Sequence, residues 1–447
     1  MEGRMAAVTD AIVRLDKQLA LAIPGLDNLD RYFEGEQPLK YMAKAMEDEI
    51  GDRVHQLIIN ILRYGAEAYE NRLDIEGFRY RGASSSDEEL WRMWQANGLD
   101  EQSQQGHLDS IALSRTYAIV GAGDDDDPLV TVESPFQVFA ERDPRTRKVS
   151  AAIKRWEEGE GNDKVQRATL YLPNSTESFV FYKNEWWSTS PADNHELGRV
   201  PVVPLVNNPR ILRPDGRSEF SDVISVADAL NKMATDMMVS GEYHAMPRRW
   251  ATALTADDFV DKDGQPIGVW SRDAGRLWAT ESKDTKFGQF NETDLKVFHE
   301  SMKLLIQIGS QLLALPPHYT SFVGENPTSA DAIRSSETQL VKRVERKQTY
   351  LGGAWEDVQR LVLRIKTGKW DPAALKLETV WRDPSTPTIA QKADAVTKLV
   401  STGVLPIEQA RADLGYTQEQ RDRMLEMDAR AKSNPDIANL TRAMNGG

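Results

Sequence analysis

Two long helical stretches separated by a short insert constrain this fold most. Residues 218–246 run without a proline until Pro247, and at 1.5 Å per residue they would form a helix roughly 40 Å long. The second stretch, residues 291–315, begins with a cap formed by Asn291 and Asp294 and ends before Pro316. One small monomer cannot easily bury the apolar stripes of both helices, whereas a ring of copies could bury them between neighbours.

The first stretch carries a row of small residues. Ala227, Ala234 and Gly241 are spaced by seven, which places them along one side of a helix. Two interpretations stay open: ordinary packing inside a monomer, or close approach by a helix of a neighbouring subunit. Other faces of this stretch are acidic, and the second stretch has an apolar stripe. The residues are Asp222, Asp228, Asp236 and Glu242 in the first, and Leu295, Phe298, Met302, Leu305, Leu312 and Leu315 in the second.

A third helical stretch, residues 328–366, follows a loop over residues 316–327. Thr328 and Asp331 have the spacing of a capping box, and the pair Gly352–Gly353 predicts a break in the helix. One side of this helix is apolar. The other is charged, which is typical of a solvated, ion-paired face, and a contact strip for phosphates or a neighbouring subunit is the alternative. The charged residues are Arg334, Lys342, Arg343, Arg346 and Lys347 against Asp331, Glu337 and Glu345.

The rest of the sequence contains both helical and strand-like segments. Residues 1–110 have mainly helical periodicity, with helices predicted over residues 39–69 and 90–100. Residues 112–207 switch to period two, which predicts strands. Residues 248–290 are short mixed pieces, and residues after about 430 are polar and expected to be mobile. The sequence therefore predicts an α+β fold. The expected strands are 128–134, a pair within 136–156, a three-stranded meander over 168–190, the extended segment 200–210 and 377–381; a helix pair surrounds Gly403.

Composition limits the function. The 447 residues are too many for one ordinary core, so two or more domains are expected. A net charge of −14 disfavours tight binding of nucleic acid, although it does not prevent the chain from surrounding it. The absence of cysteine excludes disulfides, cysteine-bound zinc and thiol nucleophiles. We expect a soluble intracellular protein, because no apolar run suits a membrane span and charges at Arg14, Asp16 and Lys17 interrupt any signal peptide.

The sequence contains only weak signals for a catalytic or metal-binding site. Asp124 to Asp127 could chelate a cation, but they lack the alternating spacing of a calcium loop and are more typical of a solvated acidic turn. The six histidines show no metal spacing, and no complete phosphate-binding or GxSxG motif is present. Trp186 and Trp187 favour core and edge packing over a platform for stacking bases. The sequence thus predicts no catalytic residue, cofactor or metal.

Several stretches, in this order, resemble the portal proteins, the head–tail connectors of tailed double-stranded-DNA bacteriophages. The most similar is GENPTSADAIRSSETQLVKRVERKQTYLGGAWEDVQRL at residues 324–361. Two departures stand out: Ser114 occupies a position where glycine is frequent, and the C-terminal portion is short. The other similar stretches are YFEG at 32–35, residues 60–80, 90–120 and 134–156, VPVVPLVNNPR at 200–210 with the long helix after it, and residues 388–420.

The resemblance implies a portal-type α+β fold assembled as a ring of about twelve subunits at one capsid vertex. It assigns each segment of the chain to a part of that fold. Residues 1–217 are the wing, 218–246 and 291–315 the two stem helices, 247–290 the clip, 316–327 the tunnel loop, 328–385 the long wing helix with its strand, 386–428 a small crown and 429–447 a flexible tail.

The resemblance also implies the partners. Double-stranded DNA would pass through an axial channel during packaging and ejection, without being read by sequence. The terminase large subunit and later a head-completion adaptor would dock at the clip, and major capsid and scaffolding proteins would contact the ring. It implies a non-enzymatic virion protein without a cofactor or membrane contact, assembled in the host cytoplasm. Alternatives are another ring-forming head–tail or tail protein, or a metal-dependent hydrolase using Asp124–Asp127.

Candidate residues follow from these assignments. An acidic channel wall would repel DNA phosphates within a screening length of about 8 Å, and so would avoid the friction that a basic wall adds. Asp222, Asp228 and Asp236 are candidates for such stem surfaces, and Ala227, Ala234 and Gly241 for stem packing. The tunnel-loop candidates are His318, Tyr319, Thr320, Ser321, Phe322 and Asn326, and the clip-docking candidates are Arg248, Arg249, Trp250 and Trp278.

Overall fold

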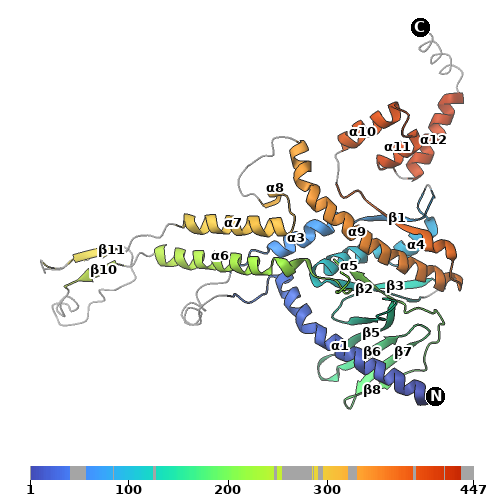
Figure 1. Cartoon of the computed structure of the whole chain (residues 1–447), viewed down its shortest axis with the longest axis horizontal. Coiled ribbons are helices and arrows are strands. Elements are labelled where there is room, and N and C mark those ends of the chain that lie inside the picture. Colours follow the sequence, from blue (N-terminus) through green and yellow to red (C-terminus); the bar gives the residue numbers. More distant parts are fainter. Residues whose placement is uncertain are drawn as a thin grey trace, which may run out of the picture. The chain divides into compact units, whose positions relative to one another are not determined.

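The computed structural model divides the chain into two compact units, residues 1–384 and 385–447 (Figure 1). The structure describes residues 2–40, 57–83, 85–123, 127–245, 249–253, 284, 286–289, 295–320, 330–385, 389–416 and 418–433. Both helices and sheets form the first unit, as the α+β prediction requires. None of the described helices is both long and apolar enough to cross a membrane.

A three-stranded antiparallel sheet lies at the centre of the first unit. β2 (Arg115–Ala122) pairs with β3 (Pro128–Glu133) on one side and with β9 (Val202–Val206) on the other. Because side chains alternate along a strand, Ala118 and Val120 of β2 enter the main helical core, whereas Tyr117 and Ile119 pack toward a second sheet. The edge position of β9 confirms the prediction for the proline-containing segment 200–210.

The second sheet has five antiparallel strands in the order β4-β5-β6-β7-β8. One face packs on α1 (Glu2–Glu34), through residues such as Ile12 and Leu15. The predicted meander and strand pair are confirmed, and so is the different placement of Trp186, which is buried, and Trp187, which is exposed. The strands are β4 (Val138–Arg142), β5 (Val149–Glu158), β6 (Val165–Tyr171), β7 (Thr176–Tyr182) and β8 (Glu185–Ser188), with a 3-10 turn at Gly161–Asp163.

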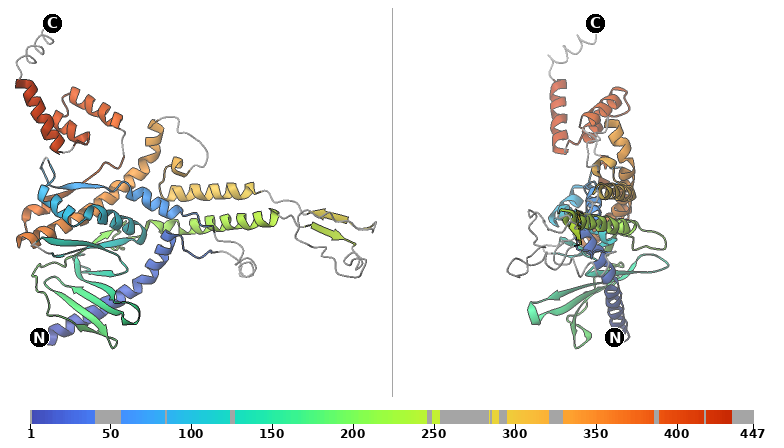
Figure 2. Two further views of the ribbon diagram at one scale, coloured as in Figure 1. Left: turned by 180° about the vertical axis from the view of Figure 1, so that it is seen from behind. Right: turned by 90° about the vertical axis from the view of Figure 1, so that its left-hand side faces the viewer.

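The two expected long helices are present but shorter than predicted. After a 3-10 turn at Glu219–Asp222, α6 spans Ile224–Ala245, and α7 spans Lys296–Leu312. They lie side by side in Figures 1 and 2. Between them in the sequence, β10 (Arg249–Thr252) pairs with β11 (Lys286–Gln289), which is a strand pair inside the predicted insert.

The third helix corrects one prediction, because α9 (Ala330–Thr367) continues through Gly352 and Gly353 without a break. Each glycine costs about 1 kcal/mol in a helix, but burial of Leu351, Trp355 and their neighbours outweighs that cost. Gly352 also allows a close contact: a Cβ there would lie 3.0 Å from the Trp381 indole nitrogen. Trp381 ends β12 (Leu377–Trp381), which pairs with β1 (Ile75–Tyr80) and follows a 3-10 turn at Pro372–Lys376.

The N-terminal helices differ in extent from the prediction. Of the helix expected over residues 39–69, the described part is helical in α3 (Ile61–Glu70) and not helical at residues 39–40 and 57–60; residues 41–56 lie outside the described part. The second predicted helix is α4 (Glu88–Ala96), after which α5 (Leu99–Leu113) begins at once. Ser114 follows α5 with a φ of 83°, which lies in the left-handed region that favours glycine.

The second unit is helical. α10 (Ile389–Ser401) and α11 (Ile407–Asp413) are the helix pair predicted around Gly403. The third helix of this unit, α12 (Gln418–Ser433), was not predicted from the sequence, and its last residues belong to the segment expected to be mobile. Its mean hydropathy is low and its apolar residues follow no clear helical stripe, so periodicity gave little signal there.

Candidate functional site

The loop expected at residues 316–327 is anchored by a short helix, α8 (Pro317–Thr320), and by the start of α9. Of the six candidates there, His318, Tyr319 and Thr320 belong to α8, whereas Ser321, Phe322 and Asn326 lie outside the described residues. The Ser310 hydroxyl of α7 lies 3.1 Å from the Thr320 hydroxyl. The loop therefore leaves a short helix that is tied directly to α7.

Arg72, just beyond α3, joins the two anchors of the loop. Its guanidinium donates to the Tyr319 hydroxyl of α8 at 2.8 Å and to the Glu337 carboxylate of α9 at 3.1 Å. A second nitrogen donates to the Pro384 carbonyl at 2.7 Å, at the end of the first unit. Arg72 is only 7% exposed and Glu337 14% exposed, so this is a largely dehydrated ion pair. We call Arg72, Tyr319 and Glu337 the arginine node.

Tyr64 supports the arginine node from α3. Its hydroxyl donates to the Tyr319 carbonyl at 3.1 Å, and the two rings meet edge to face with centroids 6.4 Å apart. His318 adds a ring nitrogen 3.7 Å from the Glu337 carboxylate. At the base of the loop, Tyr319 thus contacts α3 and His318 contacts α9, whereas Thr320 contacts α7.

A buried charge network fixes the start of the first long helix against α9. The Lys347 ammonium, with its side chain 2% exposed, donates to the Glu219 carboxylate at 2.7 Å and to the Asn207 side-chain carbonyl at 2.6 Å. Arg343, one turn earlier, donates to the other Glu219 oxygen at 3.1 Å. Burial would raise the pKa of Glu219, but Lys347 and Arg343 outweigh it and hold that pKa at about 2.

The same network reaches the end of α7. Arg343 also donates to the Leu312 carbonyl at 2.8 Å, and the Tyr69 hydroxyl donates to the Leu313 carbonyl. Burial raises the pKa of the Tyr69 hydroxyl, so it stays protonated and remains a donor. The carbonyls at a helix C-terminus lack partners inside the helix, and these donors satisfy them. We call Glu219, Lys347, Arg343 and Tyr69 the junction network.

The stem candidates are placed differently from one another. Asp222 is exposed and pairs with Arg217, and Asp236 pairs with Lys232 on α6. Asp228 is buried: it accepts from the Tyr32 hydroxyl at 2.7 Å and lies 3.1 Å from the Lys40 ammonium. The expected surface position is therefore wrong for Asp228, because its carboxylate is a partner of α1 and of the segment that follows it.

The small residues of α6 also lie in two different environments. Ala227 and Ala234 are buried within the chain, which fits ordinary packing. At Gly241 a Cβ would meet no described atom within 4 Å, so this part of the helix has open space beside it.

An exposed apolar stripe runs along α7. Val297, Leu304, Ile308 and Leu312 are between 38% and 65% exposed, and their spacings of seven, four and four residues place them on one side of the helix. The stripe predicted from the sequence contacts the core through Met302 and Leu305, but the prediction is wrong for Leu312, which is 39% exposed. Thus α7 buries one apolar side within the chain and leaves a second uncovered.

The acidic turn has a structural role at its described end. Asp127 pairs with Arg92 at 3.1 Å and with Lys366 at 2.6 Å, and these cations lower the pKa of Asp127 to about 2. Asp124, Asp125 and Asp126 lie outside the described residues. In the part of the chain that is described, no group of three acidic or histidine side chains is arranged to hold a metal ion.

Comparison with known proteins decides the family. A family model described as "Phage portal protein, SPP1 Gp6-like" matches residues 14–434. The chain belongs to this portal family. The portal proteins of Mycobacterium phages D29 and L5 are each 38% identical to it over 410 residues, which is 87% of this chain and 83% of theirs. The chain is thus a structural portal protein of a phage particle.

Solved structures of gene transfer agent particles also match the portal chain. A chain in the virion of a native particle has a TM-score of 0.45 at 12% identity, covering 80% of this chain and 88% of that one. A chain in the neck of such a particle has a TM-score of 0.44 at 13% identity over the same shares.

The clip candidates of the portal chain are only partly described. Arg249 and Trp250 begin β10, where Arg249 pairs in register with Gln289, and Arg248 and Trp278 lie outside the described residues.

Neither the arginine node nor the junction network was predicted from the sequence. Lys347 was assigned to an exposed face of α9, yet it continues the spacing of Leu340, Val344 and Leu351, which are all buried. A lysine at a core position of a helix is a signal for a buried partner, and that signal could have indicated the junction network.

Proposed function

We propose that about twelve copies of this portal chain close into a ring at one capsid vertex, with double-stranded DNA passing through its axial channel. In this proposal α6 and α7 form the stem, residues 247–290 the clip, residues 316–327 the tunnel loop, and residues 386–428 the crown. The terminase large subunit and a head-completion adaptor dock at the clip, and capsid and scaffolding proteins contact the wing. Assembly takes place in the host cytoplasm.

The observation that carries the ring is the uncovered apolar stripe of α7. Leaving Val297 and Leu304 more than half exposed forgoes about 25 cal/mol for each Å² of apolar surface, which a neighbouring copy would recover by covering them. The open space beside Gly241 on α6 supports close approach by another helix. Because these features lie on two different helices, a head-to-tail contact between copies uses both, and such contacts generate rings.

A pair of charges on the stripe tests this contact. We expect Leu304→Glu combined with Ile308→Glu to prevent ring assembly, because two carboxylates would have to be buried without partners. The matched control is Leu375→Glu, which is at a residue 74% exposed on a 3-10 turn away from α7. Light scattering of the three purified proteins gives the mass; equal masses for all three would remove α7 from the interface.

The loop is proposed to form a collar around the DNA. The duplex slides through this collar, and its base sequence is not read. The arginine node joins α8 and α9, the two elements on either side of the loop. The test is to shorten residues 320–325 in a phage and to measure the length of packaged DNA. Altered packaging or retention is expected; unchanged packaging and retention would take the loop out of the mechanism while leaving the ring intact.

A further inference from the structure

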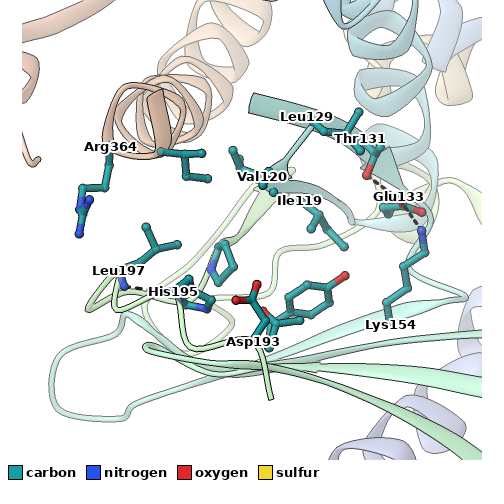
Figure 3. A pocket seen from close by; sticks show the side chains of 16 residues that line it. Ile119, Val120, Leu129, Thr131, Glu133, Lys154, Asp193, His195, Leu197 and Arg364 are labelled. Carbon is teal, nitrogen blue, oxygen red and sulfur yellow. Dashed lines mark hydrogen bonds and ion pairs between the residues drawn. The ribbon is translucent and has the colours of Figure 1, made fainter. Parts of the chain in front are cut away.

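Two cavities of the first unit differ in the charges that line them. The first, of about 450 Å³, lies between the two sheets and the C-terminal part of α9 (Figure 3). Its walls carry both signs of charge, for example Arg364 and Asp193, so charge selects no class of ligand there. The second is an open cleft of about 340 Å³. Its charged lining residues are all arginines, namely Arg142, Arg147 and Arg210.

The second cleft, which we call the arginine cleft, is formed by three segments: the turn between β4 and β5, the loop after β9, and the middle of α9. Arg142 of the turn pairs with Asp215 of the loop at 3.6 Å, which joins these two segments. From α9, Tyr350 lines the cleft and is 38% exposed. The arginines therefore lie beside an aromatic ring, and aromatic and arginine side chains are enriched where protein interfaces are strongest.

The loop after β9 exposes two large apolar side chains. The backbone amide of Arg210 donates to the Arg213 carbonyl at 3.0 Å, and that of Arg213 donates to the Arg210 carbonyl at 2.8 Å. These two bonds close a two-residue turn that consists of Ile211 and Leu212, which we call the apolar turn. Ile211 is 80% and Leu212 91% exposed, more than any other large apolar side chain of the described residues. Ile211 also lines the arginine cleft, so the turn and the cleft form one continuous surface.

The base of this loop is tied to the core, which holds the apolar turn in position. Asn207 is 2% exposed, and its backbone amide donates to the Ser114 carbonyl at 2.9 Å. Its side-chain carbonyl accepts from Lys347 of the junction network at 2.6 Å. A preorganised surface loses little entropy when a partner binds. The fold itself gains almost nothing from two apolar side chains that stay in water.

The cations of this surface are in excess. Among the described residues, Arg147, Arg210 and Arg213 form no salt bridge, although the chain as a whole has a net charge of −14. The segments that form the cleft carry further exposed cations without a salt bridge. They are Arg145 and Lys148 in the turn, and Arg346 one helical turn before Tyr350.

The carboxylates on the same segments are already used. Asp215 pairs with Arg142, as described above, and Asp222, beyond the loop, pairs with Arg217. The Asp143 carboxylate accepts hydrogen bonds from backbone amides of its own turn, at 3.0 and 2.6 Å. The surface therefore has one sign of uncompensated charge, and it favours a partner that brings carboxylates.

We propose that the arginine cleft and the apolar turn together dock an acidic segment of another protein, in which Asp or Glu residues alternate with large apolar residues. The carboxylates of this segment pair with Arg147 and Arg210 in the cleft. Its apolar side chains cover Ile211, Leu212 and the ring of Tyr350.

Two other occupants fit this surface less well. The phosphates of nucleic acid would pair with the arginines but would leave the apolar turn in water. A second copy of this chain would have to offer an apolar surface with negative charge. The uncovered apolar stripe of α7 does not match, because α7 carries Lys296 and Lys303 against one carboxylate, Glu300.

The experiment uses the full-length protein and three fluorescent peptides of equal length. The first has leucine and glutamate in a helical pattern, the second has lysine in place of each glutamate, and the third has serine in place of each leucine. Fluorescence anisotropy measures the dissociation constants. We expect the first peptide to bind about tenfold or more tightly than either of the others. Added salt should weaken this binding, because it screens the arginines.

Variants then locate the binding site. Ile211→Ser combined with Leu212→Ser should weaken binding of the first peptide by about tenfold or more, and Arg210→Gln by about fivefold or more. The matched controls are Leu375→Ser, at a residue 74% exposed, and Arg81→Gln, at a side chain 79% exposed. Both controls should leave binding unchanged. Circular dichroism first establishes that each variant keeps the melting temperature of the unmodified protein.

Equal binding of the first peptide and either of the others would overturn the proposal, and this comparison needs no variant. Equal effects of the site variants and their controls would also overturn it. If a DNA duplex binds more tightly than the first peptide and Arg210→Gln weakens the duplex, the surface is a nucleic-acid site and the proposed partner is wrong. If the double variant instead lowers the assembled mass in light scattering, the surface is a contact between copies and the proposed partner is again wrong. The peptide comparison does not depend on whether the ring forms.

Discussion

At the scale of single residues, the junction network depends on one carboxylate. Glu219 is the acceptor for both Lys347 and Arg343, and all of them connect segments far apart in the sequence. We expect Glu219→Gln to lower the free energy of unfolding by about 3–5 kcal/mol, because Lys347 would remain buried without its counter-charge. Asp222→Asn, which removes an exposed carboxylate three residues away, is the control and should cost far less.

Chemical denaturation of the variants measures this difference. Combining Glu219→Gln with Lys347→Met should recover a large part of the loss, because the unpaired charge is removed with its partner. The pH dependence has a defined sign: the pKa of Glu219 is lowered from 4.5 to about 2, so its stabilisation is present above pH 4.5 and is lost as pH falls toward 2. Equal stability of Glu219→Gln and Asp222→Asn would contradict this account.

Asp109 on α5 has the opposite pH dependence. Burial, with a smaller effect of Asp30, raises the pKa of Asp109 from 3.8 to about 6. Its folded state therefore binds the proton more tightly than the unfolded state, and stability is lost as pH rises through about 6. We expect Asp109→Asn to raise the free energy of unfolding at pH 7 by about 1–3 kcal/mol, and to have no effect below pH 4. A gain that is the same at pH 3.5 and pH 7 would show that ionisation is not its cause.

At the scale of elements, substitution by alanine is expected to change the stability in opposite directions at the two glycines of α9. Gly353 is exposed and has open space beside it, so Gly353→Ala should stabilise the protein by about 1 kcal/mol through helix propensity. Gly352→Ala should destabilise it, because the new methyl group would lie 3.0 Å from the Trp381 indole nitrogen. Thermal unfolding of both variants checks the pair, and a shift of the same sign for both would contradict the packing of β12 on α9.

The arginine node predicts a local change in dynamics. Replacing Arg72 by Met removes three hydrogen bonds that hold α8, α9 and the Pro384 carbonyl together. Amide hydrogen exchange in residues 317–320 and in the first turns of α9 should then accelerate by about tenfold or more. Arg63→Met removes an exposed arginine of α3 and is the control. The same exchange rates in both variants would show that the node does not hold the loop.

Elements were predicted best where one periodicity dominated. The meander over β6, β7 and β8 and the helices α6, α7 and α9 follow from alternation or from three- and four-residue spacing. The predicted break at Gly352–Gly353 is wrong because helix propensity depends only on the local sequence. The contact between Gly352 and Trp381 depends on a strand that is distant in the sequence, β12. The buried positions of Lys347 and Asp228 could not be derived in the same way, since each depends on a partner far away in the sequence, Glu219 or Tyr32.

At the scale of the whole molecule, assembly into a ring would explain the exposed side of α7 and the anchored loop of this portal chain together. The portal chain buries one apolar side of α7 itself, leaves Val297 and Leu304 uncovered, and anchors the loop against α3 and α9. The central claim is that copies of the chain supply the missing cover and thereby enclose a channel. This claim concerns assembly, so it is tested on the unmodified protein rather than on variants.

The most direct measurement is the mass of the purified protein in solution by light scattering, at several concentrations, with electron micrographs of the same sample. The account predicts particles of about twelve times the 50.3 kDa chain mass with a hole along their axis. Folded single chains at every concentration, with no ring in the micrographs, would contradict it.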